Sequence, residues 1–231
     1  MKIGIIGAMD MEVDSLKADA AVSRVEKKAN MEFYEGTLGG QDVVIVRCGI
    51  GKVNAALCAQ ILMDDFHVTH VINTGAAGSL DVRLDIGDVV ISTEAVEHDF
   101  DVSPIGFQKG EHPYINVRDF PASEELRERA AQAVKAAAPN VRVMEGRICS
   151  GDQFISSREK KEELIREFGG CCAEMEGAAI AHACHLNQVP FVIIRAISDK
   201  ADDSSHMSFD EFAKKAAAQG AAIVKAMMEN W

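Results

Sequence analysis

The chain has 231 residues, of which 48% are hydrophobic, and its formal net charge is -12 at pH 7. This length and apolar content predict one folded domain over residues 1–231 and exclude a disordered chain. The acidic charge argues against a nucleic-acid partner, because phosphate binding requires clustered Lys and Arg side chains. The expected partner is a neutral or zwitterionic small molecule.

The apolar N-terminal segment, residues 1–7, is short, and Asp10 and Glu12 soon follow it, which is not the pattern of a signal peptide. No run approaches the ~20 apolar residues that a membrane helix needs. The six cysteines show no paired Cys-x-x-Cys spacing, which favours reduced and mostly buried thiols. We therefore expect a cytoplasmic protein with no membrane partner.

Strand and helix patterns alternate along the chain. A short isoleucine-rich strand comes first, and the predicted strands together cover residues 2–9, 33–38, 42–48, 68–74, 88–94, 141–149 and 189–194. The dipeptide Gly39-Gly40 predicts a hairpin between the second and third of these. The predicted helices cover residues 12–20, 52–66, 122–138, 157–168, 177–186 and 209–228.

Two capping boxes, Ser156-x-x-Glu159 and Ser208-x-x-Glu211, predict where the helices at 157–168 and 209–228 begin. Residues 95–121 have little periodicity, and a loop of that length is usually functional or covers an interface. This order of elements predicts a single three-layer α/β/α domain around a mixed, mostly parallel central sheet.

The segment Gly49-Ile50-Gly51-Lys52 is similar to the end of a phosphate-binding loop. The full motif requires glycine where Val46 stands and Ser or Thr where Val53 stands, so this reading fails. Tight turns that allow close backbone approach explain the glycines.

His182 and His185 lie three residues apart on a predicted helix, with Cys184 between them. A metal site needs three or four converging ligands, and the neighbouring sequence does not supply them. Ordinary packing is the favoured interpretation, and we expect neither a metal ion nor a cofactor.

Several carboxylates stand near the ends of predicted strands or turns among apolar or glycine neighbours. They are Glu12, Glu174, Glu176 and Asp199. Each alone is more often a solvated acid or a helix cap. Ligands of open α/β sheets bind beyond the carboxyl ends of strands, however, and Asp199 follows the apolar run 189–194 in this way. A buried carboxyl with a raised pKa can also donate a proton.

Glu176 directly precedes the small-residue helix at 177–186. A carboxylate in that apolar environment needs hydrogen-bond donors, which sugar hydroxyls would supply. The alternative is an acid at a helix N-terminus that the helix dipole stabilises.

Taken together, these segments resemble the purine nucleoside phosphorylase/hydrolase superfamily, and most closely its bacterial 5'-methylthioadenosine/S-adenosylhomocysteine nucleosidases. The resemblance extends over nearly the whole chain. The matching segments are residues 1–9 with Glu12, 49–53, 73–78, 150–152 with Phe154 and Ile155, 174–176, 195–199 and 208–212.

The resemblance implies that Asp199 protonates N7 of a leaving adenine and that Ser198 steadies it. Glu12, with Arg195 nearby, would orient and activate the attacking water. Glu176 would hold the ribose hydroxyls.

For the rest of the ligand, the resemblance implies that Met175 lies against the sugar, Phe154 stacks on adenine and the Ile155 backbone reads the base edge. Ile50 and Phe209 would line the pocket of the 5'-thio group. The substrate-binding set that it implies is Ile50, Ala76, Ala77, Gly78, Phe154, Ile155, Met175, Glu176, Arg195, Ser198 and Phe209.

Members of the family are homodimers, and the resemblance implies that the loop near Ile105 and Pro113 caps the neighbour's pocket. Two features depart from the family's pattern. Ala76 and Ser79 stand where close relatives often carry serine and glycine, and Ile105 stands where the capping residue is often aromatic.

The expected reaction is hydrolysis of the N-glycosidic bond of 5'-methylthioadenosine and S-adenosylhomocysteine, and of 5'-deoxyadenosine. Three carboxylates in the loop at 9–14 would repel phosphate, which favours water as the nucleophile. The alternatives are an aminodeoxyfutalosine nucleosidase, a phosphate-dependent purine nucleoside phosphorylase, and a non-catalytic nucleoside-binding protein.

Overall fold

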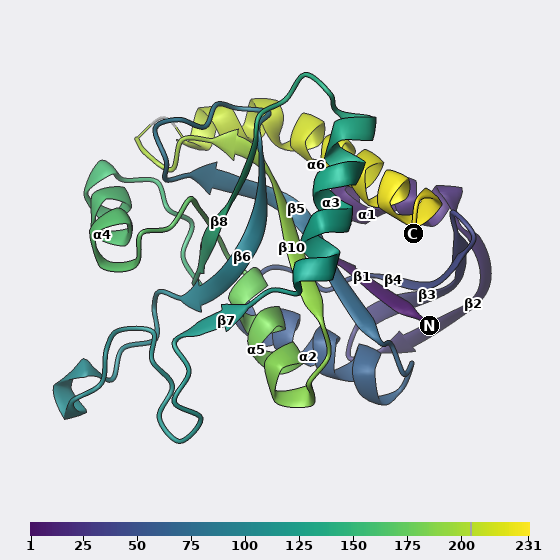
Figure 1. The fold of residues 1–231 in the computed structure, drawn as a ribbon, viewed down its shortest axis with the longest axis horizontal. Coiled ribbons are helices and arrows are strands. Elements are labelled where there is room, and N and C mark those ends of the chain that lie inside the picture. The colour runs from purple at the N-terminus through teal and green to yellow at the C-terminus, as the bar shows by residue number, and fades with distance from the viewer. Residues whose placement is uncertain (204) are drawn as a thin grey trace.

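A computed structural model describes residues 1–203 and 205–231, apart from the side chains at 206–208 and 210. Ten strands in the described part form one mixed sheet, with helices on both faces (Figure 1). The strands are β1 (Ile3–Gly7), β2 (Ala21–Lys28), β3 (Met31–Leu38), β4 (Gln41–Arg47), β5 (His70–Ser79), β6 (Val89–Glu97), β7 (Asp119–Pro121), β8 (Val143–Ser150), β9 (Cys172–Glu174) and β10 (Phe191–Asp199).

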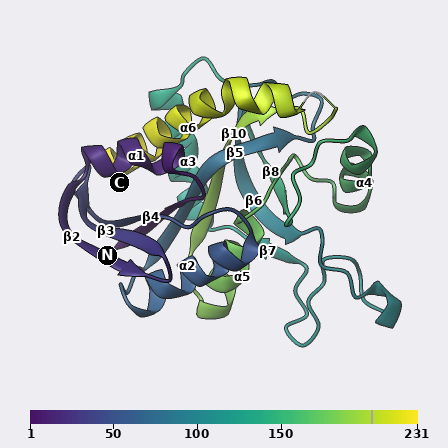
Figure 2. The ribbon, with the colours of Figure 1, turned by 180° about the vertical axis from the view of Figure 1, so that it is seen from behind.

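The helices other than α4 (Arg158–Phe168) divide between the two faces of the sheet, which confirms the expected three layers (Figure 2). On one face lie α1 (Asp10–Asp19), α3 (Glu124–Ala137) and α6 (Ser205–Glu229), and on the other lie α2 (Lys52–Asp64) and α5 (Gly177–Asn187). Strand β1 shows how one strand serves both layers. Its Ile3 and Ile5 pack with the first group of helices and Ile6 with the second, because side chains alternate across a strand.

The sheet has a parallel centre, in which β1 pairs with β4 and β5 and β10 pairs with β5. Strand β10 also pairs with β6, and β6 continues through β8 and β9 back to β5. These five strands, β5, β10, β6, β8 and β9, therefore form a closed ring of pairings. The hairpin β3–β4, predicted at Gly39-Gly40, extends the sheet on the other side and carries β2 at its edge.

Three strands run farther than the sequence suggested. Strand β5 continues through the glycine-rich segment to Ser79, β6 reaches Glu97, and β10 reaches Asp199. Strands β2, β7 and β9 were not predicted at all. Most residues of β2 are exposed, so the strand lacks the apolar alternation that would have indicated it.

Both predicted capping boxes are wrong in position. Helix α4 (Arg158–Phe168) is capped by Ser157, whose hydroxyl oxygen accepts from the backbone N–H of Lys160 at 3.3 Å. Helix α6 begins at Ser205, so Ser208 stands inside its first turn, and its side chain lies outside the described residues.

Between β6 and β7 the chain projects from the body of the molecule beside α5, with a short 3₁₀ turn, η1 (Ser103–Ile105), in the projection (Figure 1). None of the helices in the described part has both the length and the apolar character needed to cross a bilayer.

Candidate active site

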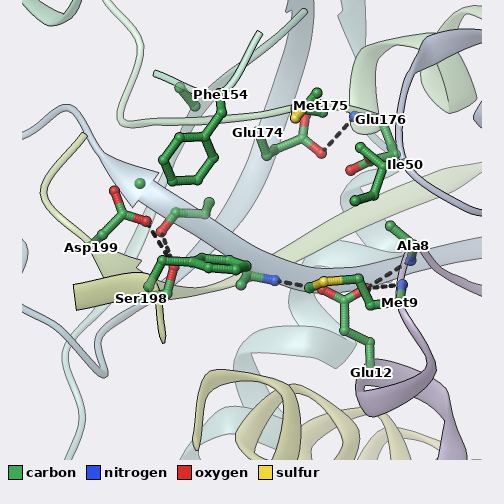
Figure 3. A pocket seen from close by; sticks show the side chains of 15 residues that line it. Ala8, Met9, Glu12, Ile50, Phe154, Glu174, Met175, Glu176, Ser198 and Asp199 are labelled. Atoms are coloured by element: carbon green, nitrogen blue, oxygen red, sulfur yellow. Dashed lines mark hydrogen bonds between the residues drawn. The ribbon is translucent and has the colours of Figure 1, made fainter. Parts of the chain in front are cut away.

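A cavity of about 320 Å³ lies where several strands end on one side of the sheet (Figure 3). Segments that follow β1, β4 and β9 contribute to it, together with the ends of β5 and β10. Its lining residues are Ala8, Met9, Glu12, Ile50, Ala76, Ala77, Gly78, Phe154, Ala173, Glu174, Met175, Glu176, Ser198, Asp199 and Phe209.

Glu12, in the first turn of α1, is only 3% exposed. One carboxylate oxygen accepts from the backbone N–H groups of Ala8 at 2.7 Å and Met9 at 3.0 Å, and the other accepts from that of Ala76 at 3.1 Å. Burial raises the pKa of Glu12 above its ordinary value, against the opposing charge of Arg195 and the three amide hydrogen bonds. This carboxyl group is therefore fixed in place, and its raised pKa makes it a stronger base than an ordinary carboxylate.

Asp199, the last residue of β10, is 2% exposed. Its Oδ2 accepts from the Ser198 hydroxyl at 2.9 Å, and its Oδ1 accepts from the backbone N–H of Ala201 at 2.8 Å. The carboxyl group is therefore held at the end of its strand, beside the cavity.

Two glycines of β5 leave space for these acids. A Cβ atom on Gly75 would lie 2.7 Å from Oε1 of Glu12, and one on Gly78 would lie 2.7 Å from Oδ1 of Asp199. Any larger residue at either position would displace a carboxylate. The glycines that suggested a turn in the sequence thus serve to admit acidic side chains beside a continuous strand.

Glu176 is 6% exposed, and its Oε1 accepts from the backbone N–H of Gly51 at 2.9 Å. Burial and the neighbouring charge of Glu174 raise the pKa of Glu176 to about 8. Its side chain makes no cap hydrogen bond to α5, although the residue stands at the N-cap position. Glu176 therefore stands at the N-terminus of α5 without capping it through its side chain.

Glu174 has that role instead, since its carboxylate accepts from the backbone N–H of Gly177 at 2.8 Å. It also accepts from the Ser150 hydroxyl and from the Arg195 guanidinium. Although burial acts to raise it, the Arg195 charge and these hydrogen bonds hold the pKa of Glu174 below its usual range.

Arg195 is 1% exposed and does not line the cavity. Its guanidinium also donates to the side-chain oxygen of Asn73. The positive charge therefore lies behind the cavity wall, where it is neutralised by Glu174 and still acts on Glu12 and Glu176 through space.

The walls of the cavity are largely apolar. The rings of Phe154 and Phe209 meet edge to face, 5.6 Å apart at 77°, and Ile50 and Met175 add aliphatic surface. In Figure 3, Asp199 and Glu176 lie on opposite sides of the cavity, and Phe154 lies on the same side of it as Met175, away from Glu12.

The structure brings most of the expected site residues together, with four exceptions. Ile155 is buried and lines a smaller adjoining hollow instead, and Arg195 lies behind Glu174. Ile105 is 71% exposed, and neither it nor Pro113 lines the cavity of its own chain. Four lining residues had no predicted role, although Glu174 was among the candidate acids; they are Ala8, Met9, Ala173 and Glu174. Ala8 and Met9 directly follow the first apolar strand, and this position at a strand end was the signal that could have identified them.

The fold and the cavity define an α/β protein with a site for a small molecule between fixed carboxylates and aromatic walls. The sequence profile of the phosphorylase superfamily matches residues 2–229, and the chain belongs to this superfamily.

Comparison with individual proteins narrows the relationship. The chain is 44% identical over 232 residues to a 5'-methylthioadenosine/S-adenosylhomocysteine nucleosidase of Glaesserella parasuis serovar 5 (strain SH0165), with all of both chains covered. It is similar to the crystal structure of the Neisseria meningitidis nucleosidase of the same name in complex with methylthio-immucillin-A, with a TM-score of 0.95, 39% identity, and 100% and 99% of the two chains covered. The futalosine hydrolase of Helicobacter pylori strain 26695 is similar at a TM-score of 0.94 and 34% identity, with 100% and 98% covered.

Proposed function

We propose that the protein hydrolyses the N-glycosidic bond of 5'-methylthioadenosine and S-adenosylhomocysteine, and of 5'-deoxyadenosine, and releases adenine. The observation that carries the proposal is the convergence of Glu12, Glu176 and Asp199 on one largely apolar cavity. The 44% identity to a nucleosidase of this name over the full chain supports it.

The first task is to make adenine a better leaving group. Asp199 stands at the end of β10, and the Ser198 hydroxyl and the Ala201 amide fix its carboxyl group. From there it donates a proton to N7 of the base. Such general-acid help is typically worth about 10²–10⁴-fold in rate.

The second task is to place and activate water. Three backbone amides hold Glu12 in one orientation, and burial raises its pKa. A raised pKa makes a carboxylate a stronger base, so it takes up a proton more readily as the water attacks. Glu12 therefore orients the nucleophile and accepts its proton.

The third task is to stabilise the positive charge that develops on the ribose. Glu176 faces the cavity and accepts hydrogen bonds from the two ribose hydroxyls, while Met175 packs against the sugar. Once it is ionised, a carboxylate fixed in an apolar cavity stabilises such charge more strongly than it would in water.

The remaining contacts select the two ends of the nucleoside. Phe154 stacks on the base, and the backbone of Ile155 reads its edge. The backbone of Ala76, Ala77 and Gly78 lies against the ligand, and Ile50 and Phe209 surround the 5' substituent.

Water is favoured over phosphate as the nucleophile by the charge of the site. The described residues that line the cavity include neither Lys nor Arg. The one buried guanidinium nearby, that of Arg195, is paired with Glu174. A phosphate dianion would therefore meet three carboxylates without an available cation.

A homodimer completes this proposal, in which the loop that carries Ile105 and Pro113 caps the partner's pocket. The high exposure of Ile105, 71%, supports a role outside its own chain. We also propose a cytoplasmic location, which the free and mostly buried cysteines support.

Purified protein incubated with 5'-methylthioadenosine in phosphate-free buffer tests the reaction. We expect free adenine and 5-methylthioribose, at a rate that added phosphate does not increase. A requirement for phosphate, with a sugar phosphate as product, would instead identify a phosphorylase.

The similarity to a futalosine hydrolase makes aminodeoxyfutalosine the second candidate substrate. Its adenine and ribose would use the same contacts, so only the pocket of the 5' group discriminates. A kcat/KM for aminodeoxyfutalosine well above that for 5'-methylthioadenosine would favour this alternative.

A further inference from the structure

A second cluster of polar side chains lies outside the cavity and has no part in the proposed reaction. Glu97 ends β6, His112 comes from the projecting segment between β6 and β7, and His182 lies on α5. One ligand atom from each of the three lies within 4.8 Å of the other two. We propose that Glu97, His112 and His182 form a binding site for a divalent transition-metal ion of the zinc class.

The distances suit such an ion. Oε1 of Glu97 lies 3.0 Å from Nδ1 of His182 and 3.5 Å from Nε2 of His112. Zinc–ligand distances of about 2.0–2.2 Å in a tetrahedron place neighbouring ligand atoms roughly 3.3 Å apart. An ion between the three atoms therefore requires only small side-chain adjustments.

The hydrogen bonding of the cluster is incomplete without an ion. His112 is 8% exposed, and within the described part of the chain its Nε2 has no hydrogen-bond partner. Buried ring nitrogens are normally satisfied, so an unsatisfied one needs an explanation. A metal bound at Nε2 supplies the missing partner.

Both imidazoles are already held in position by aromatic rings. Phe100 stacks on His112 with centroids 4.1 Å apart at 19°, and Phe120 stacks on His182 at 4.6 Å and 20°. Ligands that packing holds in place lose little freedom when an ion binds.

The second oxygen of Glu97 is occupied by Lys52, whose ammonium group donates to it at 2.8 Å and to Asp99 at 2.6 Å. Lys52 thus orients the carboxylate and leaves Oε1 directed at the two histidines. Because Asp99 balances the positive charge of Lys52, the negative charge of Glu97 remains available to attract a cation.

Two imidazoles and one carboxylate are the ligands of an open zinc site, in which water takes the fourth position. Glu97 and His182 also line a surface groove of the single chain with Lys52 and Leu186. The sequence had offered His185 and Cys184 as companions of His182, whereas its actual companions come from β6 and the projecting segment. A bound ion would tie that segment to α5.

The test is zinc binding by the full chain after treatment with a chelator, measured by calorimetry and by elemental analysis after dialysis. We expect one ion per chain. Glu97→Gln and His182→Asn should each weaken binding by at least about 10-fold, the lower range seen when only a supporting residue of a metal site is lost. His185→Asn is the matched control, because His185 is an exposed histidine three residues farther along α5. This variant should bind zinc as tightly as the unaltered protein does.

Absence of saturable binding, equal binding by Glu97→Gln, or an equal loss in His185→Asn would overturn the proposal. X-ray absorption at the zinc edge gives a second readout. It uses the unaltered protein, so it does not depend on whether a variant folds. Two imidazoles with oxygen ligands are expected, and sulfur ligands would place the ion at the cysteines and refute the site.

Discussion

At the scale of single residues, Asp199 and Glu176 are both buried acids on opposite sides of the cavity, but they are held differently. Asp199 accepts from a hydroxyl and an amide, whereas Glu176 accepts from the amide of Gly51 and feels the negative charge of Glu174. These surroundings suit the two proposed roles, proton donation to the base and binding of the sugar hydroxyls.

Asp199→Asn removes the proposed acid while keeping the size of the side chain. We expect kcat to fall by about 10²–10⁴-fold, because an amide cannot supply the proton that the leaving base needs. Ligand affinity and thermal midpoint should change little. Steady-state kinetics with calorimetric titration check this, and Asp203→Asn, at an exposed aspartate nearby, is the control that should keep the original rate. A fully active Asp199→Asn would refute the acid assignment.

The raised pKa of Glu176 predicts a pH-dependent stability. Its ordinary pKa is 4.5 and its pKa in the fold is about 8, so between these values the folded chain keeps a proton that the unfolded chain releases. This contribution to stability is fully present below about pH 4.5 and is lost as pH rises through about 8. Each unit of pKa difference is worth about 1.4 kcal/mol, so the loss amounts to a few kcal/mol at most.

Glu176→Gln removes this titration, and the free energy of unfolding of the ligand-free variant should therefore fall less between about pH 5 and 8. Urea unfolding at several pH values measures the difference between the variant and the original chain. Glu128→Gln, at an exposed site on α3, should follow the original profile. Parallel profiles for Glu176→Gln would show that its carboxyl group is not protonated in the fold.

At the scale of elements, the capping of α4 shows where local sequence patterns lose accuracy. Both Ser156 and Ser157 precede the helix, and the motif Ser-x-x-Glu selected the first. The hydroxyl that reaches a free backbone N–H is that of Ser157.

Ser157→Ala should therefore lower the free energy of unfolding by about 1 kcal/mol, the typical value of an N-cap. Ser156→Ala is the matched control and should leave it nearly unchanged. Denaturant unfolding of the two variants provides the comparison, with hydrogen exchange of the α4 amides as a local readout. Equal effects would mean that Ser157 does not cap the helix.

The sequence predicted the central strands and the helices well because their apolar patterns are strong. It missed β2, whose residues are mostly exposed, and β7 and β9, which have only three residues each. It also ended the strand of β5 at the glycines, because glycine usually indicates a turn. Gly75 and Gly78 are instead required by Glu12 and Asp199, which arrive from other parts of the chain. Such contacts cannot be read from local patterns.

The candidate site was predictable to a similar degree. The residues at strand ends indicated a group of acids, since strand ends gather ligands. The sequence could not indicate which side chains face the cavity, and so it placed Arg195 in the site and gave Glu174 no role. Arg195 stays outside the cavity because it forms an ion pair with Glu174 behind the cavity wall.

At the scale of the whole molecule, the closed ring of β5, β10, β6, β8 and β9 brings Glu176 and Asp199 together, and β1, which pairs with β5, adds Glu12. The periodicity of a sequence does not indicate which strands pair with one another. The closed ring could therefore not be predicted from the single sequence. The ring also leaves α2 and α5 together on one face, where Val53 and Leu186 are 77% and 56% exposed and line one groove. Exposed apolar surface of this kind marks contact with another protein.

This groove is the surface that we expect the second copy to cover in the proposed dimer. Val53→Glu places a charge there and should convert the protein to monomers, because a buried, unpaired carboxylate strongly opposes association. Turnover should fall as well, since the loop with Ile105 would no longer cap the partner's pocket. Val82→Glu is the matched control, at a valine that is 89% exposed elsewhere on the surface, and it should alter neither property. Light scattering after size exclusion, with rates measured over a range of protein concentrations, tests both expectations. A monomeric original chain, or a fully active monomer of Val53→Glu, would show that each pocket is complete within one chain.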